Sequence, residues 1–165
     1  MKKLVVISLF CFFNICSFSQ NKFGYIDSGE LLALMPEKKT AEEKLQSFAK
    51  SLESQLVAMQ SEYQASVTNY QNNESTYSDL VKQDKIAEIT GLEQRIQSFQ
   101  KNAQLELQKK EQELLEPILT KARTAIEDVA KAEKYTYIFD SSMGSILYAD
   151  ESENVLLLVK NKLGL

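Results

Sequence analysis

The chain has 165 residues, a formal net charge of −4 and no His, and its only two Cys residues are Cys11 and Cys16. Without His or a distributed set of Cys, the usual zinc sites and the Ser-His or Cys-His nucleophile pairs of hydrolases are excluded. We therefore expect no enzyme, metal or cofactor. An acidic chain without a Lys/Arg cluster also argues against a nucleic-acid partner.

The N-terminus has the pattern of a secretory signal peptide. Lys2 and Lys3 precede an apolar run over residues 4–13, and small residues alternate just before Gln20. The run is too short to anchor the chain in a bilayer. Residues 1–19 are therefore predicted to be a signal peptide that is cleaved before Gln20.

A lipoprotein is the alternative, because Cys16 lies at the end of this segment. The bulky Ile15 precedes it where a small residue would be required, which argues against lipid anchoring. Cleavage would remove both Cys residues and leave 17 basic against 23 acidic residues, a net charge of −6. These features predict an exported, periplasmic protein without disulfides.

A strand is predicted over residues 23–26, and it passes directly into a helix over residues 28–35. Asp27 and Glu30 have the spacing of a capping box at the start of this helix. A pair of functional acids is the alternative, but capping accounts for both residues. Pro36 either interrupts the helix or begins the long one that follows.

A long antiparallel helical hairpin is predicted over residues 37–134, with its tip at residues 75–85. Apolar or aromatic residues on its first helix step by three and four, as in a coiled coil: Leu45, Ala49, Leu52, Leu56, Met59, Tyr63, Ser66, Tyr70, Asn73, Tyr77 and Leu80. A comparable stripe returns between Ile89 and Val129, with Gly91 and Pro117 as bend points.

The stripe is polar towards the tip, because residues 61–79 contain no Leu or Ile. Burial of this polar part of the stripe therefore stabilises the pairing of the helices less than burial of Leu side chains would. Either the distal arm is more mobile than its base, or it is a poorly packed but static coiled coil.

The C-terminal part is predicted to form a β-hairpin and a short helix. Apolar residues alternate over residues 135–140, a turn follows at residues 142–145, and a second strand is predicted at residues 146–149. The last helix is expected over residues 155–163.

The predicted fold class is α+β and mostly α. A β-body, residues 20–36 and 135–165, combines the N-terminal strand with the C-terminal hairpin, and residues 37–134 form the arm. Three short strands make a poor sheet, so we expect copies of the chain to share their strands in a homo-oligomer. The seam alone would allow dimers or trimers. The residues expected in this shared β-body are Phe23, Tyr25, Tyr137, Ile138, Phe139, Ile146 and Tyr148.

The chain resembles the OmpH-like (Skp) family of periplasmic chaperones over essentially all of the mature sequence. The resemblance rests on the stretches FGYIDSGELL, YTYIFDSS, SILYADES and NVLLLVKNKLG, which bracket a Gln/Glu/Lys-rich helical hairpin. It implies a jellyfish-shaped trimer whose arms surround a cavity. That cavity would hold unfolded outer-membrane β-barrel proteins without ATP and prevent their aggregation.

The acidic charge departs from the strongly basic best-known members of the family, so binding of lipopolysaccharide or anionic membranes is doubtful for this chain. Client capture is instead expected to depend on apolar and aromatic contacts. The residues expected to face clients are Met59, Tyr63, Tyr70, Tyr77, Ile89, Ile96 and Phe99. For each of them, a place in the core of the coiled coil is the alternative.

A structural spacer or adaptor of the cell envelope that binds one folded partner is the second functional hypothesis. A spacer should bind that partner with fixed stoichiometry, whereas a chaperone should bind many unfolded chains. A hydrolase is a third hypothesis, for which the sequence supplies no nucleophile, base and orienting group together.

Overall fold

The computed structural model describes residues 21–165, which divide into two compact units. One unit comprises residues 21–29 and 124–165 and contains the strands; the other comprises residues 30–123 and is helical. The predicted signal peptide lies outside the described residues. Among those residues, no helix is both long enough and apolar enough to cross a membrane.

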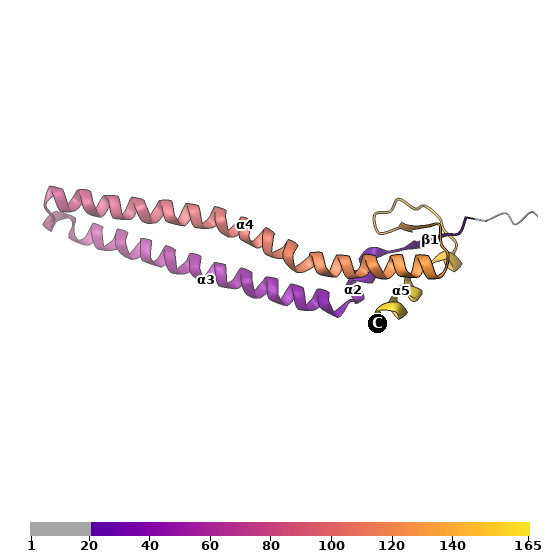
Figure 1. Cartoon of the computed structure of the whole chain (residues 1–165). Coiled ribbons are helices and arrows are strands. Elements are labelled where there is room, and N and C mark those ends of the chain that lie inside the picture. The colour runs from indigo at the N-terminus through magenta and orange to yellow at the C-terminus, as the bar shows by residue number, and fades with distance from the viewer. Residues whose placement is uncertain (1–20) are drawn as a thin grey trace, which may run out of the picture. The chain divides into compact units, whose positions relative to one another are not determined.

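The helical unit is built from α3 (Pro36–Asn73) and the part of α4 (Asp79–Ala132) that precedes residue 124. The two helices lie side by side (Figure 1), and we call this pair the arm. Glu37, in the first turn of α3, forms an ion pair with Lys121, far along α4.

The connection between the helices lies earlier in the sequence than predicted. It consists of the short 3-10 helix η2 (Glu74–Thr76) and of Tyr77, which has an extended backbone. Polar side chains bond locally here, since the Thr76 hydroxyl donates to the carbonyl of Asn73 at 2.7 Å. Such bonds compete with helix continuation. The expectation that Leu80 continues the seam of the first helix is therefore wrong, because Leu80 lies on α4 and is 78% exposed.

The arm packs along the predicted stripe. Each stripe residue of α3 from Leu45 to Asn73 is partly buried. Full burial is rare in the described arm, where Ala41 is the one residue of α3 that reaches it. A pair of helices buries one face of each partner and leaves the remaining faces exposed, so the arm has a seam without a thick core.

Pro36 begins α3, as one of the two alternatives predicted. The preceding Met35 is extended (φ −77°, ψ 123°), as expected for a residue before proline. The short helix α2 (Ser28–Leu34) therefore ends at this point. The structure leaves the capping role of Asp27 and Glu30 a prediction.

The strand-containing unit has a two-stranded parallel sheet of β1 (Phe23–Ile26) and β2 (Tyr137–Asp140). The register pairs Phe23 with Tyr137 and Ile26 with Asp140. On the opposite edge of β1, the N–H of Val155 donates to the carbonyl of Tyr25 at 2.9 Å. β1 thus has neighbours on both edges.

The predicted C-terminal β-hairpin is wrong. β2 pairs with β1, and residues 146–149 form no strand. A turn does follow β2, closed by the N–H of Gly144 on the carbonyl of Ser141 at 3.0 Å, but the chain beyond it does not return along β2. Leu147 and Tyr148 are 98% and 86% exposed. The apolar pattern of this segment therefore reflects surface residues, not a strand face that packs within one chain.

The C-terminal helix α5 (Leu156–Leu163) agrees with the prediction within one residue. The side chain of Asn154 accepts the N–H of Leu156 at 3.0 Å, and Gly164 closes the helix in a left-handed conformation (φ 73°). Val155 and Val159 are fully buried and anchor this segment in its unit.

Candidate functional site

The seven residues predicted to face clients all lie on the partly buried seam of the arm. Met59, Tyr63 and Tyr70 are on α3, Tyr77 is in the connection, and Ile89, Ile96 and Phe99 are on α4. The 3-4 spacing that singled them out is the spacing that packs two helices together. Part of each side chain therefore serves the pairing of the helices, and the remainder is accessible.

Two of these tyrosines support the end of the arm. The Tyr70 and Tyr77 rings lie 6.4 Å apart. The Tyr70 hydroxyl donates to Glu74 at 3.3 Å, and the Tyr77 hydroxyl donates to Asn69 at 3.1 Å. Burial, with the nearby Glu74 carboxylate, raises the pKa of Tyr70. These contacts give both tyrosines a structural role at the connection.

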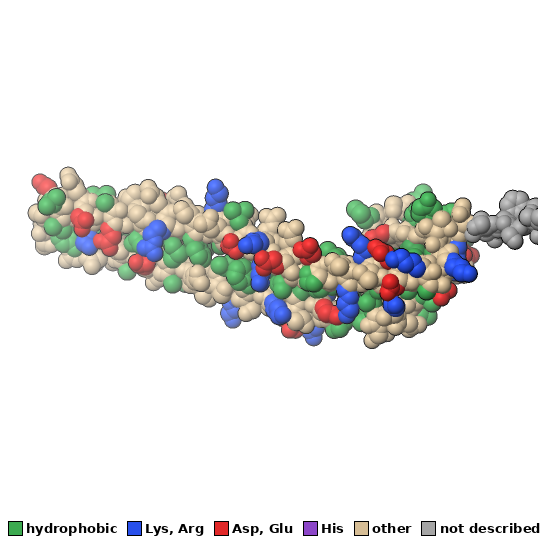
Figure 2. All heavy atoms as spheres, in the orientation of Figure 1, with side chains coloured by type: hydrophobic (Ala, Val, Ile, Leu, Met, Phe, Trp, Pro, Cys, Tyr) green, Lys and Arg blue, Asp and Glu red, His purple; other side chains and the backbone are tan. Residues whose placement is uncertain are grey.

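The arm also carries a second set of apolar side chains, of which the sequence analysis considered only Leu80, as a stripe residue. Four of them are at least half exposed and lie off the seam: Val57 (58%), Leu80 (78%), Ile86 (50%) and Leu105 (56%). Figure 2 shows apolar side chains scattered among polar ones along the arm. We call these four residues the exposed apolar set. Periodicity selects residues that pack, so it did not single out Val57, Ile86 or Leu105, and it wrongly assigned Leu80 to the packed seam.

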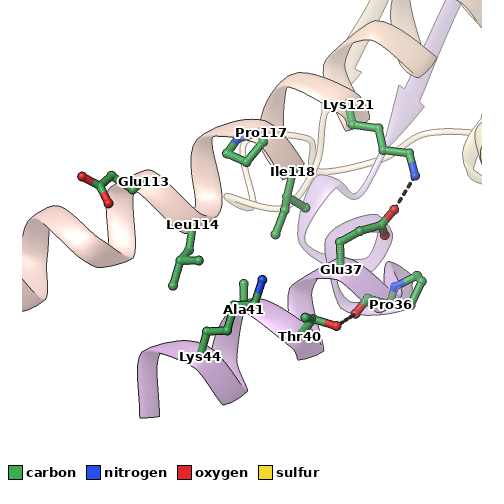
Figure 3. Close-up of a pocket in the computed structure, with 10 residues that line it drawn as sticks. All are labelled: Pro36, Glu37, Thr40, Ala41, Lys44, Glu113, Leu114, Pro117, Ile118 and Lys121. Atoms are coloured by element: carbon green, nitrogen blue, oxygen red, sulfur yellow. Dashed lines mark hydrogen bonds and ion pairs between the residues drawn. The ribbon is translucent and has the colours of Figure 1, made fainter. Parts of the chain in front are cut away.

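A hollow of the arm lies where α4 contains Pro117. It is a cavity of about 520 Å³ between the first turns of α3 and the Pro117 region of α4. Figure 3 shows Leu114 and Ile118 of α4 pointing towards Ala41 of α3. Its polar rim includes Glu37, which binds Lys121. The hydrogen bond from Lys121, followed by the backbone N–H of Glu37 itself, lowers the pKa of this carboxyl.

The outer face of the sheet carries three exposed aromatic rings, which we call the aromatic face. Phe23, Tyr137 and Phe139 are between 47% and 58% exposed. The Phe23 and Tyr137 rings stack with centroids 5.9 Å apart, and those of Tyr137 and Phe139 are 6.1 Å apart. The opposite face holds the buried Gly24 and Ile26. Three stacked rings left half exposed are an unusually apolar surface for a single chain.

Of the other residues predicted for the β-body, Tyr25, Ile146 and Tyr148 lie beside this face, whereas Ile138 pairs with Gly24 on the opposite face of the sheet. Tyr25 and Ile138 are partly buried, and the Tyr25 hydroxyl donates to Glu151 at 3.3 Å. Ile146 and Tyr148 line a hollow of about 360 Å³ together with Phe23 and Phe139. Apart from Ile138, these residues come together although the predicted hairpin does not form.

Asp140 is a polar anchor that the sequence analysis treated only as the end of a strand. Its carboxylate accepts the N–H of Ser28 at 3.2 Å, the hydroxyl of Ser28 at 2.5 Å and the N–H of Ser142 at 2.9 Å. Partial burial opposes ionisation, but the hydrogen bonds from Ser28 and Ser142 outweigh it and lower the pKa of Asp140 to about 2. This anchor ties Ser28 to the end of β2 within the strand-containing unit.

Comparison with known proteins gives a family and a fold. The sequence profile of the family "Outer membrane protein (OmpH-like)" matches residues 22–163. A crystal structure of a candidate outer membrane chaperone (OmpH-like) from Caulobacter crescentus CB15 is similar, with a TM-score of 0.77 and 15% identity. The alignment covers 87% of this chain and 83% of that one. No curated protein matches the sequence.

Proposed function

Because the chain belongs to the OmpH-like family of outer membrane proteins, we propose that it is a periplasmic chaperone that holds unfolded outer-membrane β-barrel proteins without ATP. The observation that carries this proposal is the exposed apolar set, which offers single, separated apolar side chains along a helical arm. Each such contact is weak and adaptable. Several of them together bind a disordered chain by avidity while allowing it to move.

The same proposal includes export by a cleaved signal peptide and assembly into a homotrimer. The aromatic face and the neighbouring Tyr148 supply apolar surface that a partner copy would cover. In this arrangement, residues 20–36 and 135–165 form the shared body and residues 37–134 form one arm per copy. Changing Tyr137 and Phe139 together to Ser should convert the oligomer to monomers in sedimentation. An unchanged mass would refute the aromatic face as the interface.

Lipopolysaccharide and anionic lipids are not proposed as ligands. The stretch between Lys50 and Lys82 contains no basic residue but includes Glu53, Glu62 and Glu74. Acidic surfaces repel anionic ones, particularly at low ionic strength. Client binding by this chain therefore depends on apolar contacts.

The test is to dilute a urea-unfolded outer-membrane β-barrel protein into buffer with or without the mature chain and to follow light scattering. A fourfold variant in which the exposed apolar set is changed to Ser should suppress aggregation less well than the wild type. Its matched comparison is a variant with Tyr63, Tyr70 and Tyr77 changed to Ser, which tests the seam residues directly. No suppression of scattering by the wild type, over several clients, would refute the chaperone function and favour the envelope spacer.

A further inference from the structure

The charge of the arm changes along its length. Its distal half, residues 51–100 on both sides of the connection, has seven acidic against three basic residues, a net charge of −4. Its proximal half, residues 36–50 and 101–123, has seven acidic against nine basic residues, a net charge of +2. Both halves belong to the helical unit. The two halves of one arm therefore attract charges of opposite sign.

Most carboxylates of the distal half lack a basic partner. Four ion pairs neutralise charge in the proximal half, whereas the described distal half has one, between Lys85 and Glu88 at 2.7 Å. Five exposed carboxylates of the distal half have no ion pair or hydrogen bond among the described residues: Glu53, Glu62, Asp79, Asp84 and Glu93. Their charge is open to a partner in solution.

Two members of the exposed apolar set lie beside these carboxylates. Val57 follows Glu53 by one turn of α3, and Leu80 precedes Asp84 by one turn of α4. Residues four apart on a helix have Cβ atoms about 5 to 6 Å apart. This is shorter than the Debye length of about 8 Å at physiological ionic strength, so the charge acts on whatever contacts the apolar side chain.

Leu105, in the proximal half, has basic neighbours instead. Lys101 and Lys109 lie one turn before and one turn after it on α4. Lys101 has no ion pair among the described residues, and the ammonium of Lys109 lies 4.0 Å from Glu113. Ile86, the fourth member of the set, has neighbours of both signs. The exposed apolar contacts thus differ in charge between the two halves of the arm.

We propose that the arm sorts the segments of a client by charge. Val57 and Leu80 bind extended segments in which Lys or Arg lies beside a large apolar residue, and Leu105 binds segments with Asp or Glu in that place. Residues two apart in an extended chain lie on the same side, about 7 Å from each other, which matches the helical spacing of the apolar and charged side chains. The inference rests on the proposed function, since these segments would belong to an unfolded client.

The probes are three disordered peptides, each with several Leu residues spaced by Ser, Thr and Gly. They have Lys, Glu or Ser two positions from every Leu and are titrated into the ¹⁵N-labelled mature chain. The Lys peptide should shift the amides of Val57 and Leu80 at least about threefold more than that of Leu105, and the Glu peptide should show the reverse order. The Ser peptide should show neither preference, and about 0.5 M salt should remove both.

The matched variants are Asp84→Lys and Glu62→Lys, which change the net charge equally. Asp84 lies one turn from Leu80, whereas Glu62 is an exposed carboxylate of the distal half without a member of the exposed apolar set one turn away. Asp84→Lys should transfer the Leu80 response from the Lys peptide to the Glu peptide and leave the Val57 response unchanged. Glu62→Lys should keep the wild-type order at Leu80. The same switch in both variants, or equal responses to all peptides in the wild type, would overturn the proposal.

Client aggregation separates the two possible failures. If the wild type suppresses aggregation but the Lys and Glu peptides shift the same amides equally, sorting by charge is refuted and the chaperone function stands. If the wild type suppresses no aggregation, the chaperone function is refuted, and the peptide comparison still decides the charge preference of the arm by itself.

Discussion

Asp140 is the residue whose replacement should reveal most about the strand-containing unit. It accepts three hydrogen bonds, two from Ser28 and one from Ser142. In Asp140→Asn the side chain keeps its shape but loses its charge. We expect this variant to unfold at lower urea concentration than the wild type at neutral pH.

The magnitude follows from the pKa of Asp140, which falls from 3.8 to about 2 in the folded chain. A shift of one pKa unit corresponds to about 1.4 kcal/mol, so the full shift would correspond to about 2.4 kcal/mol. Because Asp140 is exposed, screening by solvent reduces this, and we expect about 1 kcal/mol. The folded pKa is lowered, so the stabilisation is complete above pH 3.8 and is lost as the pH falls through 2.

The assay is urea unfolding of the wild type and of Asp140→Asn at pH 7 and near pH 2, at one fixed protein concentration. The difference in unfolding free energy should be about 1 kcal/mol at pH 7 and should nearly vanish near pH 2. Asp84→Asn, at an exposed carboxylate of the arm without a hydrogen bond to the described residues, serves as the control. A difference that is the same at both pH values would refute the charge-based account of Asp140.

Three further substitutions should change the urea midpoint in directions set by local packing. Gly24→Ala should destabilise the chain by about 1 to 3 kcal/mol, because the new Cβ would lie 2.9 Å from Tyr135 Cε1 and 3.0 Å from Val155 Cγ1. Gly91→Ala, in α4 with nothing within 4 Å of the new Cβ, should stabilise it by about 1 kcal/mol; a lower midpoint would contradict this. Pro117→Ala should stabilise α4 by up to about 3 kcal/mol, and an unchanged midpoint would show that the arm already compensates for the proline.

Much of the helical arm was predictable because its pattern is long and repeated. The stripe from Leu45 to Asn73 correctly predicted the packed face of α3, and Pro36 marked one of the two predicted starts of this helix. The end of α3 was less predictable, because Tyr77 and Leu80 fit the same spacing as the residues before them. The hydrogen bonds of Thr76 and Asn73 end the helix, and polar side chains leave no periodic signal.

The strands were predictable as elements but not as pairs. The alternation over residues 135–140 correctly marked β2, yet nothing local indicated that its neighbour is β1. The turn after Asp140 suggested a hairpin because such turns commonly connect adjacent strands. Ser28 and Ser142 donate hydrogen bonds to Asp140. They lie in different parts of the chain, so no sequence pattern predicts these bonds. Val57, Ile86 and Leu105 of the exposed apolar set were equally hidden, since single apolar residues on a surface are ordinary.

The parallel pairing of β1 and β2 also has a consequence for biosynthesis. Each residue of β1 pairs with one that is 114 positions later, as Phe23 does with Tyr137. At about 5 to 20 residues per second, the ribosome needs roughly 6 to 23 seconds to make the missing strand. The arm helices can form from local contacts in the meantime, whereas the sheet has to close last. A nascent chain thus completes its arm while β1 still lacks its partner strand.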